Sequence, residues 1–201
     1  MKAIESLRTR LGTWIAAAVG PLMHLLARQG VTPNHMTVAG CALAVCAALV
    51  LMAGYRASAG GLFLLASLLD LADGTLARLT GKATPFGKFL DSTLDRVGEG
   101  VMLMAIAYGL SLENNAPAVA AAVLALLGGQ LTSYIRARAE ALGFACTVGL
   151  ATRPERVAIM VAGLLLDQLA IAMYVLTAVS SITVGQRFCF VYKECSLRDR
   201  I

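Results

Sequence analysis

The sequence predicts an all-α integral membrane protein with six transmembrane helices and an amphipathic surface helix near its N-terminus. Apolar residues make up 58% of the 201 residues, above the roughly 45–50% of soluble domains, and the mean hydropathy is +0.75. Long uncharged runs recur along the chain, and basic residues gather at alternate turns between them. Aromatic residues are few and alanine, leucine and valine are common, which fits helices in lipid better than a soluble β fold.

The segment 4–28 is predicted to be an amphipathic helix that lies on the membrane surface. Its apolar residues recur at helical spacing, and Arg8, Arg10 and Arg28 could contact anionic lipid head groups. Because charges interrupt the early apolar residues, we do not expect this segment to be a cleavable signal peptide.

Six spans are expected to follow, and residues 1–201 are expected to form one membrane domain. Two spans begin after a Thr-Pro pair, Thr32-Pro33 and Thr84-Pro85, and another begins at Thr152-Arg153-Pro154-Glu155, which has the pattern of a capping box. A basic tail is expected after the last span. The predicted spans are 34–54, 60–79, 86–110, 117–142, 154–166 and 169–190, and the connections between them are turns except for a loop over 143–151.

The charge distribution predicts the orientation of these spans. Of the 17 lysines and arginines, Arg56 alone falls at the turns after spans one, three and five, which also contain Glu113 and Asp167. Because cytoplasmic loops are enriched in Lys and Arg, we expect both termini and the turns after spans two and four to be cytoplasmic. The net charge of +5 is therefore interpreted as topology, and no nucleic-acid partner is expected.

Four aspartates near the junction of the second and third spans form the candidate site. Asp70 and Asp73 are three residues apart on one helix, and Asp91 and Asp95 are four apart on the next, so each pair shares a face. The short turn between the helices requires antiparallel packing, and the four carboxylates can therefore converge near the cytoplasmic side. Carboxylates this close repel each other unless cations lie among them, and oxygen ligands favour Mg²⁺ or Mn²⁺.

Other residues on the same faces indicate a phosphate-containing ligand. Gly74 and Gly87 leave room for a bulky group, and Arg78 suits a phosphate. The predicted chemistry is therefore a metal-assisted reaction on a phosphate ester at the membrane surface. The alternative of another class is a cation or proton transporter, in which acids would be expected along several helices at the membrane midplane.

The pattern Asp70-x-x-Asp73-Gly74-x-x-Ala77-Arg78, then eight residues, then Gly87-x-x-x-Asp91-x-x-x-Asp95, resembles the signature of the CDP-alcohol phosphotransferase family. This family is also called CDP-alcohol phosphatidyltransferase class I. The resemblance implies a membrane enzyme that transfers a phosphatidyl group from CDP-diacylglycerol to an acceptor hydroxyl and releases CMP. It also implies two divalent cations, a homodimer among membrane lipids, and a site on the cytoplasmic side of the cell membrane.

The resemblance also implies a role for each residue of the signature. Asp70, Asp73 and Asp91 would be metal ligands, and Asp95 would border the metals and act as the base toward the acceptor hydroxyl, so that Asp91 and Asp95 form the catalytic pair. The implied donor site consists of Asp70, Asp73, Gly74, Ala77, Arg78 and Gly87.

Arginines in the second half of the chain predict a phosphorylated acceptor. The segment from Ser133 to Glu140 and the Arg153-Pro154-Glu155-Arg156 segment resemble the phosphatidylinositol-phosphate synthase branch of the family, whose acceptor is inositol 1-phosphate. That resemblance implies a phosphate pocket at Ser133, Arg136, Arg156 and Arg187. The branch commonly has lysine in place of Arg136, however, and a longer loop than 143–151. Glycerol 3-phosphate is the alternative acceptor, and it would give phosphatidylglycerophosphate.

Overall fold

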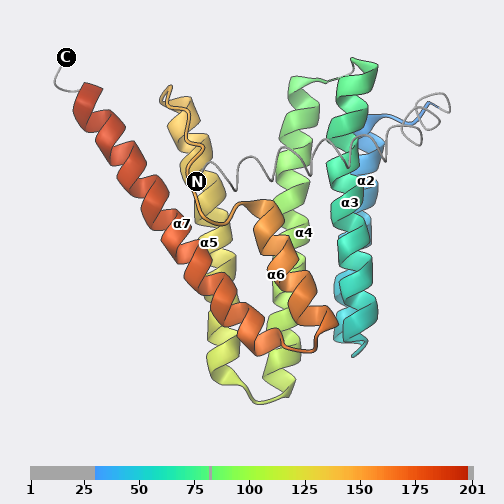
Figure 1. Cartoon of the computed structure of the whole chain (residues 1–201). Helices are drawn as coiled ribbons and strands as arrows, with labels where there is room; N and C mark the ends of the chain where they lie inside the picture. The colour runs from blue at the N-terminus through green and yellow to red at the C-terminus, as the bar shows by residue number, and fades with distance from the viewer. Residues whose placement is uncertain (1–29, 82, 199–201) are drawn as a thin grey trace. The chain divides into compact units, whose positions relative to one another are not determined.

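The structure is a computed structural model that describes residues 30–81 and 83–198 (Figure 1). Within these residues the chain is all-helical, as predicted, and contains no strand. The predicted surface helix over 4–28 lies outside the described residues. The helices are α2 (Pro33–Met52), α3 (Arg56–Thr80), α4 (Pro85–Leu112), α5 (Ala116–Ala141), α6 (Arg153–Leu165) and α7 (Leu169–Arg198).

The chain divides into two compact units. Among the described residues, the first unit contains residues 30–43, 65–81 and 83–97, and the second contains residues 44–64 and 98–198. The first unit is therefore built from the start of α2, the end of α3 and the start of α4. The second unit contains the remaining parts of these helices and all of α5, α6 and α7.

Threonine caps begin α2 and α4, as the two Thr-Pro pairs predict. Thr32 Oγ1 accepts a hydrogen bond from the backbone N–H of His35, and His35 Nδ1 accepts one from the backbone N–H of Thr32. At the start of α4, Thr84 Oγ1 accepts from the backbone N–H of Gly87 at 2.9 Å. These bonds satisfy N–H groups that have no partner inside the helix.

Two helix boundaries differ from the predicted ones by more than two residues. α3 begins at Arg56 rather than at residue 60, because Gly54, with a φ of +95°, completes the turn and the helix restarts almost at once. α7 continues to Arg198, so the residues predicted as a basic tail are helical in the described part of the chain. Arg198 donates a hydrogen bond to the carbonyl oxygen of Leu142 at 3.1 Å, and its guanidinium lies 5.8 Å from the centre of the Phe144 ring.

Four of the described helices are long and apolar enough to cross a membrane: α2, α3 as far as Ala77, α5 and α7. α6 has 13 residues, which is about 20 Å of helix against a hydrocarbon core of about 30 Å. α4 is a continuous helix, but its first half is too polar for a typical span because it contains the charged residues Lys88, Asp91, Asp95, Arg96 and Glu99. The helices therefore indicate a multi-pass membrane protein, while the number of six spans stays a prediction.

Small residues form the helix contacts of the second unit, in which α7 packs against α5 and α6 (Figure 1). A Cβ on Gly128 of α5 would lie 2.8 Å from the Cβ of Ser180 on α7. A Cβ on Gly163 of α6 would lie 2.5 Å from the Cβ of Ala172 on α7. Small residues let helix backbones approach closely, which is the main source of helix association in lipid.

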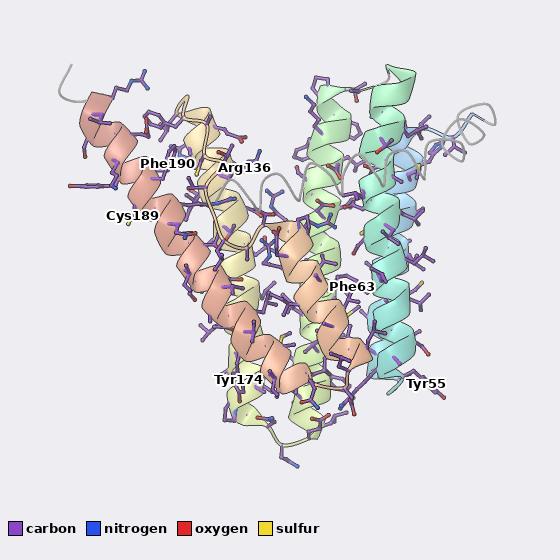
Figure 2. All side chains as sticks on the ribbon, viewed as in Figure 1. Tyr55, Phe63, Arg136, Tyr174, Cys189 and Phe190 are labelled. Atoms are coloured by element: carbon purple, nitrogen blue, oxygen red, sulfur yellow. The ribbon has the colours of Figure 1, made fainter. Side chains whose placement is uncertain are left out.

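Large apolar side chains are buried between the helices, but many are also exposed on their outer surfaces. Leu49 is 60% exposed and Ile171 is 58% exposed, and Tyr174 and Cys189, both labelled in Figure 2, are exposed on α7. Exposed apolar side chains, together with small residues where helices pack closely, are expected for helices whose outer faces contact lipid.

The three turns that the charge pattern assigns to one side of the membrane meet in the second unit. Arg56, at the start of α3, forms ion pairs with Glu113 in the α4–α5 turn and with Asp167 in the α6–α7 turn. One cation therefore joins all three turns. Their meeting supports the predicted alternation of helix directions.

The close contact between α5 and α7 predicts that Gly128→Ala destabilises the protein. The added Cβ would have to move Ser180, and overpacking of this kind costs about 1–3 kcal/mol. Thermal unfolding in detergent should show a lower melting temperature for Gly128→Ala. Gly109→Ala is the matched control, because nothing lies within 4 Å of a Cβ at that position. Equal melting temperatures for the two variants would contradict the prediction.

Candidate active site

Three of the four predicted aspartates form an acidic cluster in the first unit. Asp70 on α3 and Asp91 and Asp95 on α4 each offer a carboxylate oxygen, and these oxygens lie within 4.8 Å of one another. Oxygens that share one Mg²⁺ at about 2.1 Å are up to about 4.2 Å apart, so a small closure would let all three contact one cation. All three side chains are partly buried, and the oxygen-only set fits a hard divalent cation.

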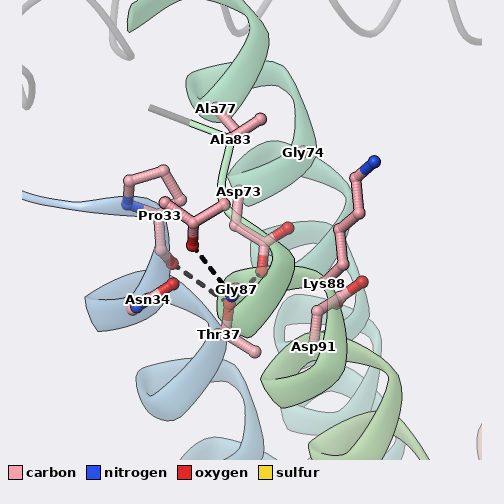
Figure 3. A pocket seen from close by; sticks show the side chains of 11 residues that line it. Pro33, Asn34, Thr37, Asp73, Gly74, Ala77, Ala83, Gly87, Lys88 and Asp91 are labelled. Carbon is pink, nitrogen blue, oxygen red and sulfur yellow. Dashed lines mark hydrogen bonds between the residues drawn. The ribbon is translucent and has the colours of Figure 1, made fainter. Parts of the chain in front are cut away.

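Asp73 differs from the other three aspartates in its contacts. It is buried, with 5% of its surface exposed, and its Oδ2 accepts a hydrogen bond of 2.5 Å from Thr37 Oγ1 on α2 (Figure 3). The Thr37 hydroxyl also lies 3.1 Å from the carbonyl oxygen of Pro33 in the preceding turn, which fixes the threonine in position. Asp73 therefore stands between α2 and the cavity described next, with one oxygen held by a neutral donor.

A cavity of about 200 Å³ lies against Asp73 and Asp91 (Figure 3). Gly74, Ala77 and Gly87, the three small residues predicted to shape the donor site, all line it. A Cβ on Gly87 would lie 3.0 Å from Asn34 Oδ1 and 3.1 Å from Thr84 Oγ1, so this glycine keeps part of the cavity open. The other lining residues are Pro33, Asn34, Thr37, Ala83, Thr84 and Lys88.

Several residues of this cavity are not part of the predicted site. Asn34 and Thr37 are three residues apart on α2, so they share a helix face. Together with His35 they are the polar residues of a helix that is otherwise apolar. That pattern could have identified them from the sequence. Lys88 follows Gly87 and adds a positive charge to the cavity lining. Arg78 belongs to α3, but its side chain lies outside the described ones.

The residues predicted to bind the acceptor phosphate all belong to the second unit. Arg187 of α7 lies near enough to Arg136 and Arg156 for their positive charges to repel its own. The structure therefore brings the three arginines into one region. Ser133 is partly buried on α5 and lies three residues before Arg136, on the same helix face.

Each of these arginines has a partner within the protein. Arg156 is 3% exposed, and its Nε and Nη2 donate to the two carboxylate oxygens of Glu99 at 2.6 and 2.7 Å. Arg187 is also 3% exposed, and it donates to the carbonyl oxygens of Thr132 and Val148 at 2.6 and 2.9 Å. Arg136, labelled in Figure 2, is exposed and pairs with Glu140 one helical turn later, at 2.8 Å.

Glu99 is a further functional candidate that is not part of the site predicted from the sequence. It continues the spacing of four residues that joins Gly87, Asp91 and Asp95, and this regularity is the signal that could have singled it out.

Comparisons with known proteins test the predicted family. The family model described as CDP-alcohol phosphatidyltransferase matches residues 30–186. The phosphatidylinositol phosphate synthase of Corynebacterium glutamicum is 38% identical over 185 residues, which cover 88% of this chain and 84% of that protein. The archaetidylinositol phosphate synthase of Methanothermobacter thermautotrophicus is 34% identical over 173 residues, which cover 83% of this chain and 86% of that protein.

Solved structures agree with these matches. The crystal structure of Mycobacterium tuberculosis phosphatidylinositol phosphate synthase with CDP-DAG bound matches with a TM-score of 0.80 at 32% identity, covering 86% of this chain and 92% of that chain. The same enzyme in complex with manganese and citrate matches with a TM-score of 0.81, covering 86% and 88%. The family predicted from the aspartate signature is confirmed, and the chain belongs to the CDP-alcohol phosphatidyltransferase family.

Proposed function

We propose that this enzyme transfers the phosphatidyl group of CDP-diacylglycerol to inositol 1-phosphate and releases CMP. The observation that carries the proposal is the acidic cluster of Asp70, Asp91 and Asp95 in the same unit as a cavity lined by Gly74, Ala77 and Gly87. The relatives support the substrates, because they are named for inositol phosphate lipids and one is solved with CDP-DAG bound.

The aspartates are proposed to hold two divalent cations, Mg²⁺ or Mn²⁺. Asp70, Asp91 and Asp95 would supply the ligands of the acidic cluster, and the oxygen of Asp73 that Thr37 does not hold would supply a further one. Bound divalent cations would offset the negative charge of the donor diphosphate and of the departing CMP. The cations would in turn offset the repulsion between the carboxylates that bind them.

The chain's own residues would orient the donor and move one proton. Gly74, Ala77 and Gly87 leave space for the nucleotide, and Lys88 and Arg78 are proposed to contact its phosphates. Asp95 would take the proton of the acceptor hydroxyl as the acceptor oxygen bonds to the lipid-side phosphorus. The bond from that phosphorus to CMP then breaks, so one bond forms for each bond broken.

The acceptor phosphate is proposed to bind Ser133, Arg136, Arg156 and Arg187. The closeness of Arg136, Arg156 and Arg187 supports this, because it concentrates positive charge and arginine is well suited to bind phosphate. Glycerol 3-phosphate is also an anion and stays the alternative acceptor, but the names of the relatives favour an inositol phosphate. Arg136 is exposed and its ion pair with Glu140 is open to solvent, so it could exchange this partner for a phosphate at low cost.

We further propose six spans, an N-terminal surface helix, a homodimer, and cytoplasmic placement of both termini and the active site. The meeting of Arg56, Glu113 and Asp167 supports the alternation of the spans, and the count of lysines and arginines supports the orientation.

The acceptor assignment predicts the outcome of a substrate panel. Protein purified in detergent should release CMP from CDP-diacylglycerol with inositol 1-phosphate and Mg²⁺ or Mn²⁺, and excess chelator should stop the reaction. Glycerol 3-phosphate, inositol and serine should give much lower rates, measured as CMP release under the same conditions. If glycerol 3-phosphate reacts faster than inositol 1-phosphate, the alternative acceptor is the correct one. If only unphosphorylated alcohols react, the proposed pocket does not bind an acceptor phosphate.

The proposed roles of Asp91 and Asp95 predict severe losses in Asp91→Asn and Asp95→Asn. Removing a general base typically slows a reaction by about 10²–10⁴-fold, and we expect losses of at least this size in both variants. Mn²⁺ binding, measured by electron paramagnetic resonance without substrates, should also weaken in Asp91→Asn. Asp167→Asn, in the α6–α7 turn, is the control and should retain both properties. Near-normal turnover in either active-site variant would exclude the mechanism.

The Thr37–Asp73 bond predicts that Thr37→Val impairs the donor site. Valine keeps the shape but leaves the buried Asp73 oxygen without its donor, which costs about 1–3 kcal/mol. We expect weaker Mn²⁺ binding and a raised KM for CDP-diacylglycerol, both by several-fold. Thr177→Val removes a comparable hydroxyl, which donates to the carbonyl oxygen of Ala121 at 2.7 Å in the second unit, and should leave both quantities near wild type. Identical values for the two variants would argue against a role for Thr37.

A further inference from the structure

The ion pair between Glu99 and Arg156 is the most deeply buried charge pair among the described residues. Glu99 on α4 is 5% exposed and Arg156 on α6 is 3% exposed. Both carboxylate oxygens are used, at 2.6 Å from Nε and 2.7 Å from Nη2. A buried ion pair is a weak source of stability, because removing both charges from water offsets most of the attraction between them. Its presence therefore suggests a role other than stability.

The protein leaves space for this pair at a third helix. A Cβ on Gly129 of α5 would lie 3.0 Å from Glu99 Oε1 and 3.4 Å from Arg156 Nε. Any larger residue would press on the bond that joins the two side chains. Three helices of the second unit therefore determine where the guanidinium of Arg156 lies.

The bonds to Glu99 use only one edge of the guanidinium. Arginine presents five N–H donors in a rigid fork, and Glu99 takes the edge formed by Nε and Nη2. Among the described residues, no hydrogen bond involves Nη1 of Arg156. That edge can donate to a second anion without breaking the first pair.

Arg187 is held in a similar way close to Arg156. Its Nε and Nη1 donate to Val148 and Thr132 carbonyl oxygens, and Gly149, with a φ of +145°, lies beside its guanidinium. The two arginines interact electrostatically. In both arginines, protein groups accept hydrogen bonds from part of the guanidinium. This arrangement is expected of arginines that are ordered before an anion binds.

We propose that Glu99 is a positioning residue that holds Arg156 with its Nη1 edge available to the phosphate of the acceptor, and that Gly129 is required for this arrangement. The inference rests on the proposed function, because it takes the bound anion to be the acceptor phosphate. Glu99 itself does not contact the acceptor; it acts by fixing the arginine that does. A guanidinium that is fixed in advance loses less freedom when it binds phosphate, so the effect should be specific to the phosphorylated substrate.

The direct test is Glu99→Gln, which keeps the side-chain size but removes the charge and one of the two acceptors. We expect the KM for inositol 1-phosphate to rise by roughly 10-fold or more, the loss expected for a charged hydrogen bond. The KM for CDP-diacylglycerol and the affinity for Mn²⁺ should stay near wild type, because the residues proposed to bind the donor and the cations lie in the first unit. A folded Glu99→Gln with an unchanged KM for inositol 1-phosphate would overturn the proposal, as would equal losses for both substrates.

Gly129→Ala tests the same positioning role if Glu99→Gln does not fold. This variant keeps both charges and displaces the pair by a few tenths of an ångström, so we expect a several-fold rise in the same KM alone. Gly100→Ala on α4 is the matched control, because its Cβ would meet only Leu126 Cδ1, at 3.7 Å. If Gly129→Ala and Gly100→Ala have the same KM for inositol 1-phosphate, the proposal fails.

The exchanged pair Glu99→Arg with Arg156→Glu separates positioning from stability. A pair with a purely structural role would recover both its melting temperature and its acceptor KM in the double variant. We expect recovery of the melting temperature relative to the single variants, but a KM for inositol 1-phosphate that stays raised, and recovery of both would overturn the proposal. Wild-type enzyme that turns over no phosphorylated acceptor would overturn the proposed function and this inference together, whereas normal wild-type turnover with unaffected variants overturns the inference alone.

Discussion

A charged side chain in an apolar helix needs a partner, and this constraint determines how the polar residues of this protein are arranged. Water is scarce around such a helix, so each charge must find a counter-charge, a hydrogen bond or a cation. In the first unit the aspartates are close together, and the neutral hydroxyl of Thr37 satisfies one oxygen of Asp73. In the second unit Glu99 and backbone carbonyl oxygens satisfy Arg156 and Arg187.

The two kinds of partner suit two kinds of task. Backbone carbonyls and a carboxylate of the protein itself bind the arginines, so their partners do not depend on a substrate. The acidic cluster has surplus negative charge of its own, so it is suited to ligands that come and go with the reaction, such as a cation and the diphosphate attached to it. A transferase that binds a new nucleotide donor in each cycle needs both properties.

Local rules in the sequence predicted the threonine caps that begin α2 and α4 and the helix faces that the aspartates share. Thr32 and Thr84 act as caps because capping depends only on the next few residues, and the spacing of the aspartates determines which helix face they occupy. The extension of α7 could not be predicted in the same way, because it depends on contacts of Arg198 with Leu142 and Phe144, more than fifty residues away in the chain. The spacing of four residues could have singled out Glu99, but its pairing could not be predicted, because its partner Arg156 comes from another helix.

The shared ion pairs of Arg56 also have a consequence for synthesis of the chain. Arg56 is made before Glu113 and Asp167, so α2 and α3 are synthesised while this cation still lacks both of its protein partners. Glu113 arrives with the α4–α5 turn, and Asp167 only with the last pair of helices. Each of these later turns therefore adds an anion to the same arginine, and the cluster is complete only when the α6–α7 turn has been made. Arg56 thus connects an early turn of the chain to two later ones.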